Sequence, residues 1–352
     1  MTKIPISCLH LIFDFIHNDF KFLIHRGNES NNQFQKEESP CSGNDQYHDK
    51  KKKKKKKKLF SIELIMRTGL EDYFENILLS RRFKYILCNE AAKRGYTSTL
   101  KWSRDHGCSW NSNVCMYAAK GGHLDCLIWA KEHGCSWNSD TCTVAARGGH
   151  LDCLIWAKEH GCSLDSDTCT AAAQGGHLDC LIWAREHGCG WNSDTCIAAA
   201  TGGHLDCLIW AREHGCNWST VTARLAAIGG HLNCLIWARE HGCQWDAWVT
   251  WYSSRNGHLD CLIWAIEHGC DLDEDCCTAA AEGGHLDCLK WVQKNGCKWN
   301  LDSCLIAAQK GHLDCLIWAT ENGFYWDPLQ CRKRAELYRK YNITDWMTSI
   351  GY

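Results

Sequence analysis

Apolar and polar positions repeat along most of the chain with a period of 27 residues, and each period holds two short helical patterns. In one period, Leu151, Leu154 and Ala157 recur at the spacing of one helix face, and Cys153 and Trp156 widen that face. A helix with this spacing packs its apolar side against a core and leaves its polar side in water. The pattern therefore predicts an amphipathic helix in the second half of each period.

Residues with strong preferences for helix ends set the expected bounds of both helices. Asp140 is a favourable N-cap for a first, Ala-rich helix over 141–147, which the pair Gly148–Gly149 ends. The second helix is expected over 151–160 and stops at Gly161. Each period is therefore predicted to fold as a helix-turn-helix unit.

Histidine marks the copies of this unit. An eroded first copy has Tyr96 at the His position and Trp102 at the Trp position. A leucine-rich repeat allows the same period, but Glu159 stands where that repeat needs Asn, within the helix-forming sequence Ala-Lys-Glu, so the helical interpretation is preferred. The eight clear copies carry Gly-His-Leu-(Asp/Asn)-Cys-Leu at His123, His150, His177, His204, His231, His258, His285 and His312.

The unit resembles the ankyrin repeat through the phrase Gly-His-Leu-Asp, the glycine that ends the second helix, and the Ala-Ala pair before the next Gly-His. The usual ankyrin unit has about 33 residues and carries Thr-Pro-Leu-His before the Ala-Ala pair. Here Asp140 stands in the Thr place, Thr141 in the Pro place and Cys142 in the buried Leu place. The missing residues come from the loop between Asn138 and Asp140, where ankyrin repeats carry a projecting β-hairpin. The resemblance covers residues 85–327. The shortened unit is similar to the short ankyrin-like repeats of large DNA viruses and protists.

This resemblance implies an all-α fold, an ankyrin-like α-solenoid of about nine helix-turn-helix repeats with shortened hairpin loops. It also implies a non-catalytic protein–protein interaction scaffold that binds a protein partner through the concave surface of the array. One repeat cannot bury its own apolar face, so a surface shared by several repeats is expected to bind.

One position in the repeat varies while its apolar neighbours barely change. In ankyrin proteins the residue after the Ala-Ala pair faces the concave groove, so its variation predicts a recognition stripe. Tolerated surface drift would produce the same pattern. The stripe residues are Lys120, Arg147, Gln174, Thr201, Ile228, Arg255, Glu282 and Gln309.

Two consecutive repeats between Asn217 and Gly257 depart from the pattern and form the second candidate for partner binding. Arginine and aromatic residues stand there in place of small or aliphatic ones, and these residue types dominate binding energy at interfaces. Alternatively these repeats are decaying copies, in which Trp248 and Trp251 fill space left by lost Cys and Ala. The candidate residues are Arg224, Trp248, Trp251, Tyr252 and Arg255.

Each repeat also holds residues that nominally suit zinc, such as His150 with Cys142, Cys153 and Cys162. Buried thiols that act as small apolar residues explain the same pattern. Where the repeating Cys is lost, it becomes Thr99, Ala223, Thr250 or Phe324, and never His or Asp. The sequence therefore predicts packed thiols with no metal, no cofactor and no disulfide.

The repeated histidines and tryptophans are expected to be structural, because equivalent residues in every repeat do not form a unique active site. The Gly-His histidines are expected to hydrogen-bond their loop to the next repeat, and both Trp sets are expected in the core. No phosphate loop, nucleotide fingerprint or hydrolase elbow is present, so no enzyme is predicted. The Trp sets are Trp129, Trp156, Trp183, Trp210, Trp237, Trp264, Trp291 and Trp318 in the second helix, and Trp110, Trp137, Trp191, Trp218, Trp245, Trp299 and Trp326 after it.

The segments outside the array have a different character. The lysine run 50–58 follows a polar stretch and is typical of a solvated low-complexity linker, with a nuclear-localisation patch or a tether to an anionic surface as alternatives. The expected organisation is an N-terminal apolar segment (1–26), a disordered polar and poly-Lys linker (27–58), N-terminal capping helices (59–84), the repeat array (85–327) and a C-terminal cap (328–352).

Residues 4–16 loosely resemble the opening of an F-box, the motif that docks substrate adaptors onto ubiquitin ligases. An alternative function is therefore a substrate-recruiting adaptor, with ubiquitin-ligase components as partners. The simpler interpretation of the same residues is a frayed apolar N-terminus.

Charge and composition exclude other classes of protein. Without the lysine run, 30 basic residues face 41 acidic ones, which argues against a nucleic-acid partner. No stretch of 18 apolar residues is present, so no membrane insertion is expected. An odd count of 27 cysteines without a good signal peptide predicts an intracellular location, in cytoplasm or nucleus, or in the host cytoplasm for a viral protein.

Overall fold

The computed structural model describes residues 81–352, with side chains from Leu87 onward. The expectations for residues 1–26, for residues 27–58 and for capping helices within 59–80 lie outside the described residues. The chain divides into two compact units, the first comprising Met1–Ala91 with Ser98–Ser109 and the second Ala92–Thr97 with Trp110–Tyr352. Most of the described part of the first unit is α3 (Arg81–Arg94) and α4 (Thr97–Asp105).

Every regular element among residues 81–352 is an α-helix, which confirms the predicted all-α solenoid. None of these helices is both long and apolar enough to cross a membrane. In the second unit the pairs are α5 (Asn113–Lys120) with α6 (Leu124–Glu132), α7 (Thr141–Arg147) with α8 (Leu151–Glu159), α9 (Ser166–Gly175) with α10 (Leu178–Glu186), α11 (Ser193–Gly202) with α12 (Leu205–Glu213), α13 (Thr220–Gly229) with α14 (Leu232–Glu240), α15 (Trp248–Asn256) with α16 (Leu259–Glu267), α17 (Cys276–Gly283) with α18 (Leu286–Lys294), α19 (Leu301–Lys310) with α20 (Leu313–Glu321), and α21 (Pro328–Leu337) with α22 (Tyr341–Ser349).

The helix ends agree with the sequence, but the capping side chain does not. Asp140 directly precedes α7, and its side chain accepts no capping hydrogen bond. Two residues earlier, Asn138 Oδ1 accepts from the Asp140 amide at 2.9 Å. The equivalent Asp165 lies in extended backbone and accepts from the Thr168 amide at 3.0 Å, which satisfies one of the open donors at the start of α9. The capping position is therefore the one that Asn138 occupies, not the one that Asp140 occupies.

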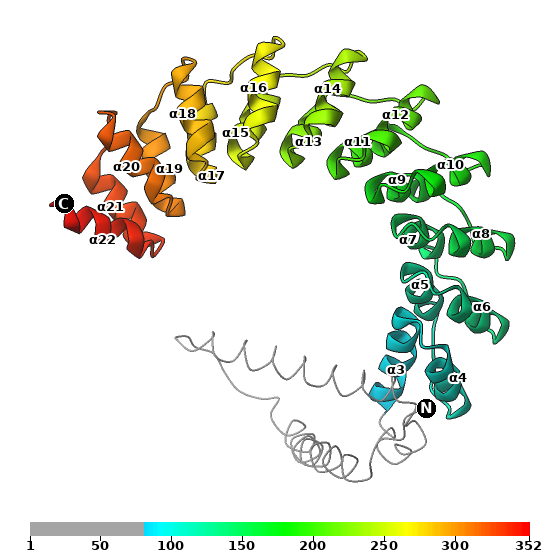
Figure 1. Cartoon of the computed structure of the whole chain (residues 1–352). Helices are drawn as coiled ribbons and strands as arrows, with labels where there is room; N and C mark the ends of the chain where they lie inside the picture. The colour runs from blue at the N-terminus through cyan, green and yellow to red at the C-terminus, as the bar shows by residue number, and fades with distance from the viewer. Residues whose placement is uncertain (1–80) are drawn as a thin grey trace, which may run out of the picture. The chain divides into compact units, whose positions relative to one another are not determined.

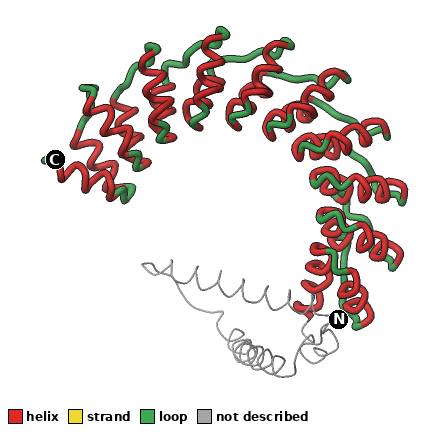
Figure 2. Tube along the Cα trace, in the orientation of Figure 1, coloured by secondary structure: helices red, strands yellow, loops and turns green. Residues whose placement is uncertain are grey.

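The second unit is a curved row in which the first helix of each pair lies on the inner side and the second helix on the outer side (Figures 1 and 2). Neighbouring first helices contact each other along their length, whereas neighbouring second helices meet at few positions. The first helices pack closely because their Ala pairs, such as Ala145 and Ala146, are completely buried. The second helices carry Leu and Trp at their packed positions, and these larger side chains hold the outer layer apart. The alternation of small and large side chains thus explains the curvature.

The core is continuous from repeat to repeat. In α8, Cys153, Leu154 and Ala157 are completely buried, and the same three positions are buried in the second helix of nearly every other repeat. No single helix pair could bury these residues alone, so each pair depends on its neighbours for stability.

The segment predicted as a C-terminal cap folds as a further helix pair. The first helix of this pair, α21, ends at Leu337, and the chain turns before α22. Arg339 has a φ of 56°, the left-handed conformation that Gly311 adopts in the preceding repeat. Trp346 follows Trp318 by 28 residues rather than 27, so one inserted residue conceals the last repeat from a search at constant period.

Candidate protein-binding surface

The repeat histidines fix the C-terminal ends of the first helices. His204 Nε2 donates to the carbonyl of Gln174 at 3.1 Å, and His231 Nε2 to that of Thr201 at 3.0 Å. The same bond joins His258 to Ile228 and His312 to Glu282. These bonds reach back to the preceding repeat, so the expectation of a bond to the next repeat was wrong in direction. Their acceptors are backbone carbonyls of stripe residues, and the histidines therefore hold the stripe in place.

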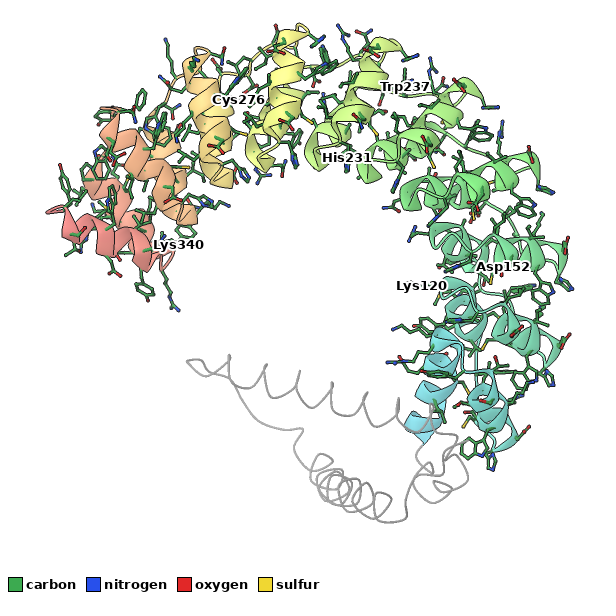
Figure 3. The ribbon with its side chains drawn as sticks, in the orientation of Figure 1. Lys120, Asp152, His231, Trp237, Cys276 and Lys340 are labelled. Carbon is green, nitrogen blue, oxygen red and sulfur yellow. The ribbon has the colours of Figure 1, made fainter. Side chains whose placement is uncertain are left out.

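The stripe residues lie on the inner side of the row. Figure 3 shows Lys120 at the inner edge, and its counterparts take the equivalent position on each first helix. The two residues before each of them are completely buried, as Ala118 and Ala119 are before Lys120. Lys120, Arg147, Gln174 and Thr201 are exposed, whereas Ile228, Arg255, Glu282 and Gln309 are partly covered. A variable surface row thus stands on a nearly constant buried one, in which only Ser253 and Ser254 replace the Ala pair.

Charged stripe residues differ in whether they have partners. Arg255 donates to both carboxylate oxygens of Glu282, at 3.0 and 2.9 Å, and Lys310 Nζ lies 3.4 Å from the same carboxylate. The hydrogen bond from Arg255 lowers the pKa of Glu282. Within the described residues, Lys120 and Arg147 have no such ion pair. Among the stripe residues, unpaired positive charge therefore lies only on α5 and α7.

We define the inner face as the stripe together with the residues three, four and seven positions before each stripe residue, which share its side of the helix. At the position seven residues earlier, most repeats carry an exposed acid, and α13 and α15 instead carry Val221 and Trp248. These two side chains are 38% and 46% exposed, and no other large apolar residue on helices α5 to α20 is classed as exposed. The acids are Asp140, Asp167, Asp194, Asp275 and Asp302.

An aromatic cluster surrounds Trp248 on α15. Its ring centroid lies 5.3 Å from that of Trp251 and 5.7 Å from that of Tyr252, and Trp251 meets Tyr252 edge-on at 5.0 Å. The Arg255 guanidinium lies 5.4 Å from the Trp251 ring centroid. On α13, the Arg224 side chain is held by hydrogen bonds to Asp246, with Nε to Oδ1 at 3.0 Å. The structure thus brings the residues of the two irregular repeats together on one surface.

The core space of these two repeats is filled without Trp248. Thr250, Ser253 and Ser254 take the places of the lost Cys and Ala pair, and all three are completely buried. Thr250 Oγ1 donates to the Asp271 carbonyl at 2.9 Å and so connects α15 to the loop after α16 of the same repeat. Trp251 packs against the core cluster and is only partly exposed. Space filling therefore accounts in part for Trp251 and not for Trp248.

The outer side carries the other tryptophans, and they are half-buried rather than core residues. Trp156 stacks on His160 at a centroid distance of 4.1 Å and meets Trp137 of the preceding repeat edge-on at 5.9 Å. Trp299 alone among the two sets is buried, at 9% exposure. Figure 3 shows Trp237 on this outer side. An apolar residue at the same helix position in every repeat indicates that this side chain contacts a neighbouring element. The pattern does not show whether a further layer of structure covers the side chain and buries it completely.

The cysteines of the described chain are buried, and several donate to backbone carbonyls of the preceding repeat. Cys189 Sγ lies 2.8 Å from the Asp165 carbonyl oxygen, and Cys216 Sγ lies 3.0 Å from that of Asn192. Burial raises the pKa of Cys207 to about 11, which keeps this thiol protonated near neutral pH. Among residues 81–352, no group of three or more His, Cys, Asp or Glu side chains could hold a metal ion.

No protein-family model matches the sequence, and neither does any curated protein. Among solved structures, the chain is similar to the crystal structure of the human ASB11 ankyrin repeat domain. The TM-score is 0.38 with 18% identity, over 45% of this chain and 84% of that one. A TM-score this low carries no argument about function. The chain's own helix-turn-helix units, with their Gly-His turns and short loops, decide the description of the fold. The array is a helical solenoid of ankyrin-like repeats.

Proposed function

We propose that this chain is a non-catalytic scaffold that binds a protein partner through the inner face of its array. The observation that carries the proposal is the contrast between buried and exposed positions on the first helices. The Ala pair is buried in nearly every repeat, whereas the residue that follows it changes in size and charge. A constant support with a variable surface is the arrangement that solenoids use for recognition.

The strongest contribution to binding is expected from the aromatic cluster on α15. Aromatic and Arg side chains dominate interface energies because they bury a large area and lose little conformational entropy. Trp248 is held by Trp251 and Tyr252 at one edge and remains 46% exposed. The stripe residues and Arg224 form the surrounding contact area. Arg255 and Glu282 are proposed to contribute through their shape, since their charges neutralise each other.

No catalytic role is proposed, because the His and Cys residues of the array recur in equivalent surroundings and serve packing and hydrogen bonding between repeats. The F-box-like residues 4–16 lie outside the described part of the chain, and no structural observation favours the ligase-adaptor alternative. The proposed function is therefore limited to partner binding by the array.

The test begins with a partner identified by proximity labelling with the full chain as bait. Replacing Trp248 with Ala is expected to weaken its binding about thirtyfold or more, because hot-spot side chains contribute about 2 kcal/mol or more. The free energy of unfolding should change by less than about 0.5 kcal/mol, because Trp248 is not part of the core. Isothermal titration calorimetry and chemical denaturation measure the two quantities.

Tyr325→Ala is the matched control, because Tyr325 is 69% exposed and lies in a loop away from the inner face. It should change neither quantity. A second variant, Arg147→Glu, reverses a stripe charge that has no ion pair within the described residues. Unchanged affinity in Trp248→Ala, Tyr252→Ala and Arg147→Glu alike would reject the inner face as the binding surface.

A further inference from the structure

We infer that the inner face at α13 and α15 binds a segment of the partner protein that presents an apolar side chain flanked by lysine or arginine. This inference rests on the proposed function and specifies the chemistry of the partner.

The apolar requirement follows from the side chains that the two irregular repeats expose. Val221 and Trp248 occupy equivalent positions of adjacent repeats, so they lie about 10 Å apart, the usual distance between packed helices. Trp251 and Tyr252 pack beside Trp248, and Ile228 continues the apolar surface along α13. Apart from the partly buried Ile197 on α11, the flanking repeats have polar or small residues at the corresponding positions. An apolar patch of two repeats is therefore bounded on both sides and fits one anchoring side chain of a partner.

The basic requirement follows from the charges around that patch. On the preceding repeat, Asp194 is exposed, and on the following repeat Asp273, Glu274 and Asp275 stand at the start of α17. None of these carboxylates forms an ion pair within the described residues. The unbalanced charge at both sides of the patch is therefore negative, and it complements a segment with Lys or Arg next to its apolar residue.

The cations nearest the patch do not cancel this charge, because each already has an acidic partner. Arg224 is paired with Asp246, and Arg255 and Lys310 share Glu282. The unpaired cations of the stripe, Lys120 and Arg147, lie on α5 and α7. Arg147 is three repeats before α13, about 30 Å along the stack, which exceeds the screening length at physiological salt. An acidic segment at the patch would meet repulsion and no compensating charge.

The anchor and the charges are expected to contribute differently. Burying an apolar side chain against Trp248 supplies most of the affinity, whereas exposed charges act mainly on the association rate and on the choice among competing segments. Binding should therefore weaken with added salt and still depend chiefly on Trp248. The two contributions can be separated by substitution.

The experiment selects ligands for the full chain from a displayed library of random linear peptides. The enriched peptides are expected to share an aromatic or aliphatic residue with Lys or Arg nearby. Fluorescence anisotropy of the best peptide should show at least tenfold weaker binding to Trp248→Ala. The double variant Asp194→Asn/Asp275→Asn should bind threefold to tenfold more weakly and show a smaller salt dependence, since Asp273 and Glu274 remain. The matched control Glu213→Gln/Glu240→Gln removes two exposed charges from the outer helices α12 and α14 and should bind as the unchanged protein does.

The outcomes separate this inference from the proposed function. Enrichment of acidic peptides, or of peptides without an apolar residue, overturns the inference, and so does failure to enrich any peptide. The proposed function survives these results if the natural partner still loses affinity for Trp248→Ala. If the natural partner binds Trp248→Ala, Tyr252→Ala and Arg147→Glu with full affinity, the proposed function fails as well.

Discussion

Adjacent glycines precede most of the repeat histidines, and the structure assigns the second of them two separate tasks. Gly176 has a φ of 75°, a conformation that other residues adopt at a cost. A Cβ atom at Gly176 would also lie 2.6 Å from Cε1 of His204 in the next repeat, where it would displace the imidazole. Gly188, which ends the second helix α10, has a φ of 87° and nothing within 4 Å of the corresponding Cβ position. Substituting each of the two glycines therefore distinguishes the cost of the left-handed backbone from the cost of displacing the neighbouring histidine.

Replacing Gly188 with Ala is expected to cost about 1 kcal/mol of unfolding free energy, the cost of the left-handed conformation alone. Gly176→Ala should cost at least about 2 kcal/mol more, because it also displaces His204 and breaks the bond of its Nε2 to the Gln174 carbonyl. Urea denaturation followed by tryptophan fluorescence measures both. If the two substitutions destabilise the protein equally, the position of the His204 imidazole does not depend on the absence of a Cβ atom at Gly176.

At the scale of a helix, the bounds and the apolar spacing were readable from the sequence because they depend on neighbouring residues, whereas the capping residue was misplaced by two positions, at Asp140 instead of Asn138. The first helix over 141–147 and the stop at Gly161 needed only local preferences. The Arg255–Glu282 pair was missed, although opposite charges 27 residues apart in a stacked repeat are a usable signal. The direction of the histidine bonds and the half-burial of the tryptophans could not be predicted. Both depend on how neighbouring repeats stack, which periodicity does not specify.

Helix α15 differs most from the common repeat unit, and one of its buried polar groups has no hydrogen-bond partner. Ser254 Oγ donates to the Thr250 carbonyl at 2.8 Å, so its hydroxyl is satisfied. The Ser253 hydroxyl is buried without a hydrogen-bond partner. A buried polar group without a partner loses its hydration and gains nothing in return. The two serines stand where nearly all other repeats have Ala, so Ala is known to fit this position of the repeat.

Ser253→Ala is therefore expected to stabilise the protein by about 1 kcal/mol, since it removes an unsatisfied hydroxyl and leaves the packing unchanged. Ser254→Ala should be close to neutral, because it removes a hydroxyl whose bond is already made. The midpoint of thermal unfolding, compared between the two variants, tests the difference. Destabilisation by Ser253→Ala would mean that its hydroxyl makes a bond that the structure does not contain.

Across the whole second unit, stability and solubility depend on how the stack ends. Every inner repeat is covered by the next one, and its Ala and Leu residues, such as Ala307 and Leu316, are completely buried by that contact and by their own core. The last helix pair carries Arg334 and Thr344 at the equivalent positions. Arg334 is exposed and bonds to Gln309 of the preceding repeat at 2.9 Å. Solenoids need a polar outer surface on their terminal repeats to remain soluble, and these two substitutions supply it.

The double variant Arg334→Ala/Thr344→Leu restores the common repeat residues to this end and is expected to make the protein self-associate, because the end then resembles an uncovered interior repeat. Sedimentation velocity over a range of protein concentrations would show a rising weight-average mass. Lys333→Ala/Asp345→Ala is the control, since it removes two exposed charges from α21 and α22 at positions equivalent to Ile306 and Ile317, which remain partly exposed in the preceding repeat. If the double variant stays monomeric wherever the control does, Arg334 and Thr344 do not keep the end of the stack from associating, and the remaining polar residues of the last pair suffice.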